Sequence, residues 1–211
     1  MRERLAAVEA RISAAGGTGV EVLAVTKGFG ADAIDAAVAA GCRSIGENYA
    51  QELLDKLSRR GESATPEIHF IGRLQSNKVR SLSGVVDVYE SVDRGSLVDA
   101  IARRDPGARV LVQVDTTGQP GKGGCPCGDV ATLVDAAADA GLRVEGLMTV
   151  GPTEGGPEAA RDGFRAVREM TTQLGLRVCS MGMTDDLEAA VEEGSTQVRV
   201  GTALFGWRDA R

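Results

Sequence analysis

The chain has 211 residues, of which 26% are charged and 43% are apolar, and its formal net charge is −6. This composition is ordinary for a globular protein, and the length allows one sizeable hydrophobic core. An acidic chain with 3% aromatic residues lacks the basic face and the stacking platforms of nucleic-acid-binding proteins, so we expect no nucleic-acid partner. Its apolar stretches are too short to span a bilayer, and we expect a cytoplasmic protein without a membrane partner.

Eight short apolar segments have the pattern of buried parallel strands. In chain order they cover residues 20–25, 44–46, 68–71, 86–89, 109–114, 143–148, 177–179 and 197–200. Several are rich in β-branched residues, as is typical of strands that are buried on both faces. An amphipathic helix over residues 4–14, built on Leu5, Val8 and Ile12, comes before the first strand.

Amphipathic helical patterns separate these strands. For example, Leu53, Leu54 and Leu57 follow Ala50 at the spacing of one helix face. Eight alternating strands and helices predict an α/β fold, a (β/α)8 TIM barrel with an extra N-terminal helix, as a single domain over residues 1–211. An open doubly wound sheet is the alternative, which is weakened because no glycine-rich dinucleotide fingerprint follows the first strand.

The strand ends of this predicted barrel carry a lysine and two turns of small residues. Lys27 follows the first strand, Ser180 and Gly182 follow the seventh, and Gly201 and Thr202 follow the eighth. Active sites of such barrels lie at the C-terminal ends of the strands, and phosphate often binds to the loops after strands seven and eight. Because strand one pairs with strand eight in a closed barrel, we expect the Lys27 amine to lie one small ligand away from a phosphate cradle.

A strand-end lysine that is partly removed from water can have a lowered pKa and form a Schiff base with a carbonyl compound. Each residue also has a simpler interpretation: Lys27 as a solvated charge, Ser180 and Thr202 as turn residues, and Arg199 as an ion-pair partner. Taken together, they indicate a site for a phosphorylated aldehyde. His69, the only histidine, is either a hydrogen-bonded strand residue or an acid–base group. The four cysteines lack the usual spacing of zinc ligands, so we expect no metal site.

At these residues the chain resembles the pyridoxal phosphate homeostasis protein family, whose fold is similar to the N-terminal barrel of alanine racemase. The matching motifs run in order along nearly the whole chain: AVTK (24–27), IGENYAQE (45–52), HFIGRLQSNK (69–78), GLMT (146–149), SMGMTDD (180–186) and GSTQVRVGTALFG (194–206). The resemblance implies that Lys27 carries pyridoxal 5'-phosphate (PLP) as an internal aldimine. It further implies that Ser180, Gly201 and Thr202 hold the phosphate and that Arg199 faces the pyridine nitrogen.

Three other positions are informative within this resemblance. Asn48 belongs to a family motif near the cofactor ring. Arg73 stands where a histidine or proline is frequent, and Thr184 stands where serine is usual. Neither departure affects the presumed anchoring residues, although Thr184 can alter the phosphate turn.

Binding of the cofactor does not by itself imply catalysis. An arginine opposite the pyridine nitrogen leaves the ring a weaker electron sink, because guanidinium stays protonated. Alanine racemase tolerates the same arrangement, so the arginine alone does not decide between a carrier and an enzyme. Racemisation also needs an acid–base group on each face of the substrate. Alanine racemase takes the second one, a tyrosine, from a separate C-terminal domain, whereas this chain ends at Arg211 directly after the last barrel motif.

We therefore expect a carrier with no robust catalytic activity, one that buffers PLP and delivers it to PLP-dependent apoenzymes as a monomer. The alternative is a low-efficiency, single-domain, PLP-dependent amino-acid racemase or lyase. A third hypothesis is a barrel enzyme that uses Lys27 on a sugar phosphate without a bound cofactor.

Overall fold

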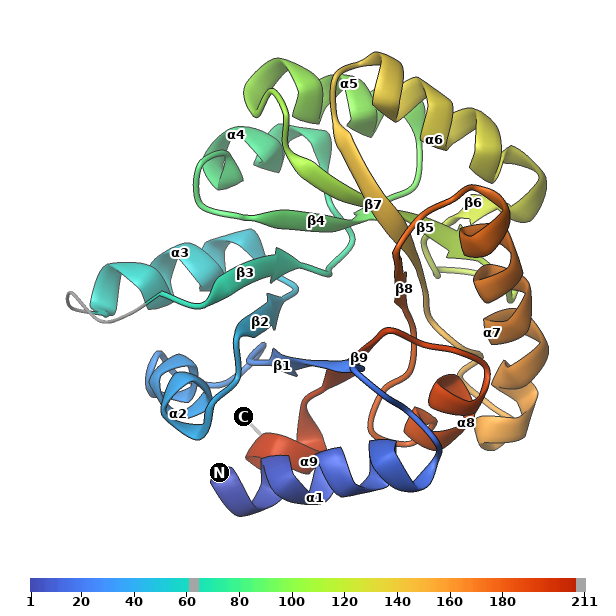
Figure 1. The fold of residues 1–211 in the computed structure, drawn as a ribbon. Coiled ribbons are helices and arrows are strands. Elements are labelled where there is room, and N and C mark those ends of the chain that lie inside the picture. The colour runs from blue at the N-terminus through green and yellow to red at the C-terminus, as the bar shows by residue number, and fades with distance from the viewer. Residues whose placement is uncertain (61–64, 208–211) are drawn as a thin grey trace.

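The computed structural model describes residues 1–60 and 65–207, and eight parallel strands in it close into a barrel (Figure 1). The barrel strands are β1 Glu21–Val25, β2 Ser44–Glu47, β3 Glu67–Phe70, β4 Val88–Val92, β5 Arg109–Asp115, β7 Arg143–Thr149, β8 Val178–Ser180 and β9 Gln197–Val200. Strand β1 pairs with both β2 and β9, and pairing of β4 with β5 closes the ring. The predicted (β/α)8 barrel is confirmed, and the open doubly wound sheet is excluded.

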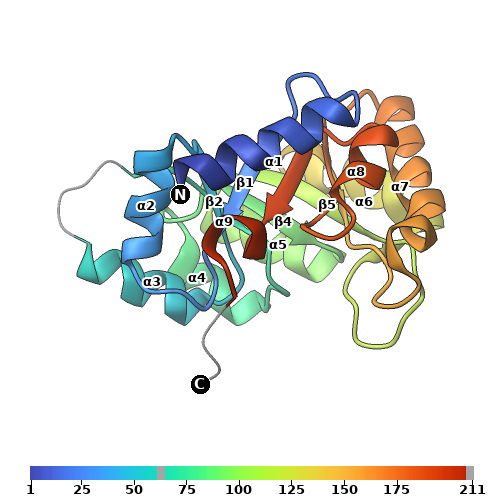
Figure 2. The same cartoon turned by 90° about the horizontal axis from the view of Figure 1, so that it is seen from below.

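Helices form a layer around the outside of the barrel (Figure 1). They are α1 Arg2–Ala14, α2 Asp32–Ala40, α3 Ala50–Arg59, α4 Val79–Leu82, α5 Gly95–Arg104, α6 Val130–Asp139, α7 Gly156–Gln173, α8 Leu187–Glu192 and α9 Thr202–Phe205, with 3₁₀ turns η1 Ser76–Lys78 and η2 Cys127–Asp129. The extra N-terminal helix is confirmed as α1, which lies beside α8 and α9 (Figure 2). Its buried face contains the predicted Leu5, Val8 and Ile12.

Side chains of each strand alternate between two environments, because successive residues of a strand point to opposite faces. The larger apolar cluster, which includes Ala24, Ile45 and Phe70, is the layer between the barrel wall and the helices. A separate small cluster of Val88, Leu111 and Met148 fills part of the barrel interior. The rest of the interior contains polar side chains, and these determine the floor of the site described below.

Two features of the sheet differ from the sequence prediction. The fourth strand extends to Val92, because Glu90 and Ser91 are buried inside it with hydrogen-bond partners of their own. A two-residue strand, β6 Cys125–Pro126, pairs with the end of β5 and has no counterpart in the hydrophobic pattern. Within the described ranges, no helix combines the length and the apolar character needed to cross a bilayer.

Candidate ligand-binding site

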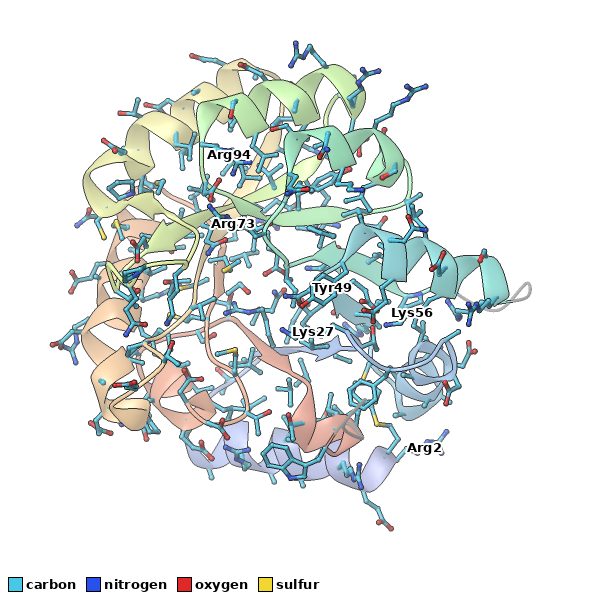
Figure 3. All side chains as sticks on the ribbon, turned by 180° about the vertical axis from the view of Figure 1, so that it is seen from behind. Arg2, Lys27, Tyr49, Lys56, Arg73 and Arg94 are labelled. Carbon is cyan, nitrogen blue, oxygen red and sulfur yellow. The ribbon has the colours of Figure 1, made fainter. Side chains whose placement is uncertain are left out.

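A pocket of about 380 Å³ opens at the C-terminal ends of the strands, and this volume is within the usual range for small-molecule sites. It brings together five of the six residues predicted from sequence, namely Lys27, Asn48, Arg199, Gly201 and Thr202. Figure 3 shows the labelled Lys27 near the middle of the barrel. These residues come together because closure of the barrel pairs β1 with β9, in a register of four residue pairs.

Lys27 lies in a tight turn that directly follows β1. The backbone N–H of Phe29 donates to the carbonyl oxygen of Thr26 at 3.1 Å and closes the turn. Gly28 has a φ of 76°, a left-handed conformation that a side chain rarely adopts and that type II turns require at their third position. The ring of Phe29 lies 5.1 Å from that of Phe205 in α9. The turn that carries Lys27 is therefore packed against the helix that follows β9.

A buried group of charged residues lies behind this turn. The ammonium of Lys56 in α3 contacts the carboxylates of Glu47 and Glu52, both at 2.6 Å. It also donates to the carbonyl oxygen of Thr26 at 2.7 Å. We refer to Lys56, Glu47 and Glu52 as the Lys56 cluster. Sequence reasoning missed it, although a lysine three residues after Leu53 falls on the buried face of an amphipathic helix and is a usable signal.

Asn48 follows the end of β2 at the edge of the pocket. Its side-chain oxygen is buried and has no hydrogen-bond partner among the described residues. The backbone is held close to the next loop, since a Cβ at Gly72 would lie 2.0 Å from the carbonyl oxygen of Asn48. An acceptor that is buried without a partner indicates a position where a ligand can supply the donor.

The loops after β8 and β9 form the opposite wall of the pocket. Thr184 lines the pocket, and its hydroxyl oxygen lies 3.5 Å from the backbone nitrogen of Ala203 in α9. Gly201 is the N-cap of α9 and Thr202 is its first residue. Because the first N–H groups of a helix have no acceptor within it, Thr202 offers a donor to an anion, while the N–H of Ala203 donates to Thr184. Sequence reasoning noted Thr184 only as a departure from a motif, whereas the structure places it in the pocket wall.

Ser180 is the one predicted site residue that the structure does not bring into the pocket lining. Its hydroxyl donates to Glu90 at 2.8 Å and accepts from Gln197 at 2.9 Å and from Arg199 at 2.8 Å. Glu90 in β4 is not a sheet neighbour of β8, so the bond from Ser180 to Glu90 crosses the barrel interior, whereas Gln197 and Arg199 lie on the adjacent β9. Because side chains alternate between the two faces of a strand, the side chain of Ser180 in β8 points into the barrel interior. Its hydroxyl there supports Arg199 from below the pocket floor.

Arg199 forms the floor of the pocket and is 4% exposed. Its guanidinium donates to the carbonyl oxygen of Ser180 at 2.7 Å and to that of Thr149 at 2.6 Å. Burial lowers the pKa of Arg199, while the carboxylates of Glu90 and Asp186 oppose this effect. Arginine stays protonated in proteins, so the pocket floor is a fixed cation.

Below Arg199, an ion-pair network fills the barrel interior. The Nδ1 atom of His69 lies 2.5 Å from Oε1 of Glu90, and its Nε2 atom lies 3.5 Å from Oε1 of Glu67. Burial lowers the pKa of His69, but the two carboxylates outweigh this and raise it to about 9. His69, together with Arg109, lowers the pKa of Glu67 to about 2 against the opposing effect of burial. His69 is therefore a charged, paired interior residue and lies outside the pocket.

Barrel, lysine turn and small-residue loops together define a class: (β/α)8 proteins that hold a small phosphorylated ligand at the C-terminal ends of their strands. The family described as alanine racemase, N-terminal domain, matches residues 1–209. A pyridoxal phosphate homeostasis protein of Pseudomonas aeruginosa is 40% identical over 98% of this chain and 95% of its own length. One from Escherichia coli K12 is 38% identical over 90% and 86%. The chain therefore belongs to the pyridoxal phosphate homeostasis protein family.

Solved structures agree with this assignment. PipY of Synechococcus elongatus PCC7942 without PLP has a TM-score of 0.86 and 31% identity, over 98% of this chain and all of that one. PipY with PLP bound has a TM-score of 0.84 and 29% identity, over 97% and 99% of the two chains. A lysine decarboxylase from Selenomonas ruminantium, 17% identical, shares the fold with a TM-score of 0.67.

Proposed function

We propose that residues 1–211 form one PLP-binding domain that holds the cofactor through Lys27 and serves in PLP homeostasis by buffering or delivering it. The observation that carries the proposal is the pocket, which joins the Lys27 turn to the loops after β8 and β9 around a fixed arginine. The names of the relatives and the PLP-bound PipY structure support the same ligand.

The residues of the pocket fit this cofactor. The Lys27 amine is the group that can bond covalently to an aldehyde, and the hydroxyl of Thr184 and the N–H group of Thr202 are donors suited to a phosphate. The buried oxygen of Asn48 accepts a donor such as the phenolic hydroxyl of the ring. We assign the phosphate to Thr184, Gly201 and Thr202, with Ser180 supporting Arg199 instead of touching the phosphate.

Two observations support a carrier without robust catalysis. Arg199 offers protonated nitrogens toward the pocket, so a pyridine nitrogen above it receives a hydrogen bond and not a full proton. Among the described residues, neither tyrosine lines the pocket: Tyr89 is fully buried with its hydroxyl donating to Asp105, and Tyr49 is 60% exposed. Burial, together with Asp105, raises the pKa of Tyr89, which keeps its phenol protonated.

The first experiment measures the yellow absorbance that forms when PLP is added to the purified protein. Lys27→Ala is expected to lose the borohydride-reducible adduct, whereas Lys78→Ala, which removes an exposed lysine, is expected to keep it. A wild-type protein that stays colourless contradicts the proposal. An adduct retained by Lys27→Ala contradicts the assignment of the lysine.

A second experiment separates the carrier from a racemase or lyase. Amino acids are incubated with the PLP-loaded protein in deuterium oxide, and exchange at the α-carbon is followed by mass spectrometry. A carrier is expected to exchange no faster than free PLP. Rapid exchange with turnover would favour the enzyme. Delivery is tested by mixing the loaded protein with a PLP-dependent apoenzyme and measuring recovered activity, and the expected monomer is tested by light scattering.

A further inference from the structure

The Lys56 cluster holds the chain on both sides of Lys27. The ammonium of Lys56, a residue that is 4% exposed, donates to the carbonyl oxygen of the residue just before Lys27. Glu52 accepts a hydrogen bond from the backbone N–H of the residue just after Lys27. The same ammonium joins Glu52 to Glu47. One buried cation therefore links both peptide groups that flank Lys27, the proposed anchor.

Alternative roles for Lys56 fit this geometry less well. Its three N–H donors meet three oxygen acceptors, on Thr26, Glu47 and Glu52. With its donors engaged in this way, Lys56 is a hydrogen-bonded structural contact and not a second anchor for an aldehyde. Buried ion pairs are in addition weak evidence for stability, because desolvation offsets their attraction. The contacts are placed where they fix the shape of the turn.

The cluster also reaches the second wall of the pocket. Glu47 is fully buried, accepts from the hydroxyl of Thr26 at 2.6 Å and directly precedes Asn48. Its second carboxylate oxygen has no hydrogen-bond partner among the described residues. Removal of Lys56 would leave this carboxylate in the apolar layer with Thr26 alone. Figure 3 shows Lys56 outside Lys27, toward the helical layer.

We propose that Lys56 is a positioning residue of the cofactor site, whose ammonium fixes the Thr26–Phe29 turn so that the Lys27 amine reaches the aldehyde of PLP. This inference rests on the proposed function. In the step concerned, the nitrogen of the neutral Lys27 amine bonds to the aldehyde carbon. The aldehyde oxygen leaves as water together with the two amine protons. Lys56 exchanges no proton in this step and acts only through the backbone.

The test compares two ligands that differ at the reacting carbon. PLP carries an aldehyde there, whereas pyridoxine 5'-phosphate carries an alcohol and binds through its ring and phosphate alone. Lys56→Met is expected to weaken PLP binding by about tenfold or more and to slow imine formation, since small misplacements of reacting groups are costly. Binding of pyridoxine 5'-phosphate is expected to be unchanged. The matched control Lys78→Met, at an exposed position outside the pocket, is expected to alter neither ligand.

Each other outcome overturns the inference. Equal losses of affinity for both ligands would show that Lys56 only maintains the fold. Unchanged PLP binding would show that the turn keeps its shape without the Lys56 ammonium. If the wild-type protein forms no imine at all, the proposed function fails, which is a distinguishable result. If Lys56→Met does not fold, Glu52→Ala replaces it. That change removes the carboxylate that accepts from the N–H of the residue after Lys27. Because the site is half-buried and alanine has a high helix propensity, α3 is expected to stay folded. The same selective loss of PLP affinity is expected.

Discussion

His69 is expected to make the stability of the fold depend on pH between 6.5 and about 9. It is the only histidine, it is 5% exposed, and Glu90 and Glu67 flank its two ring nitrogens. Its pKa is raised from 6.5 to about 9. At about 1.4 kcal/mol for each pH unit, this corresponds to an upper estimate of about 3 kcal/mol of unfolding free energy.

The sign follows from proton counting. Between pH 6.5 and about 9 the folded protein keeps the His69 proton while the unfolded chain has released it. The stabilisation is therefore fully present below pH 6.5 and is lost as the pH rises through about 9. Urea denaturation across this range should show the fall. NMR of the single imidazole, on protein without a histidine tag, should give the raised pKa directly.

The control replaces both partners, His69→Gln together with Glu90→Gln, so that no uncompensated carboxylate stays in the interior. This double variant is expected to lose the fall in stability over the same pH range, because a neutral pair binds no extra proton. Two results would refute the reasoning: an imidazole that titrates near 6.5, the ordinary value, or a pH dependence that is equally steep in the double variant.

Four further predictions concern the pocket and the core. Thr184→Val, which removes the pocket hydroxyl at similar volume, should weaken PLP binding by about tenfold, the cost of about one hydrogen bond to a charged group. Ser180→Ala should instead lower the unfolding free energy by about 1–3 kcal/mol, because buried partners lose their hydrogen bonds. A larger loss of PLP affinity in Ser180→Ala than in Thr184→Val would reverse the phosphate assignment. Gly72→Ala places a Cβ 2.0 Å from the carbonyl oxygen of Asn48 and should destabilise the fold by about 1–3 kcal/mol; an unchanged urea midpoint would contradict the observed close approach. Leu53→Ala, at a fully buried position of α3, should lower the free energy of unfolding by about 2–5 kcal/mol in urea denaturation. PLP should still bind one to one. A smaller loss of unfolding free energy would mean that the helix repacks around the cavity.

Much of the fold could be predicted because its signals are local. Short β-branched segments between amphipathic helices predicted eight strands, and the barrel has them with most boundaries shifted by one or two residues. Barrel closure then placed Lys27 beside Gly201 and Thr202, since the first strand must pair with the last. Strand β4 was predicted too early along the chain, because Glu90 and Ser91 read as a polar strand end whereas buried partners keep them inside the strand.

The rest depended on which way each side chain points and on partners far away in the chain. The sequence alone determined the barrel, the strand end that carries Lys27 and the loops that face it. Only the tertiary structure decided that Ser180 turns into the interior toward Glu90, and that Thr184 takes its place in the pocket wall. It also revealed Lys56 beneath the lysine turn. The physical reason is that a buried polar residue must find its partners across the fold, and neither spacing nor hydrophobicity along one chain specifies them.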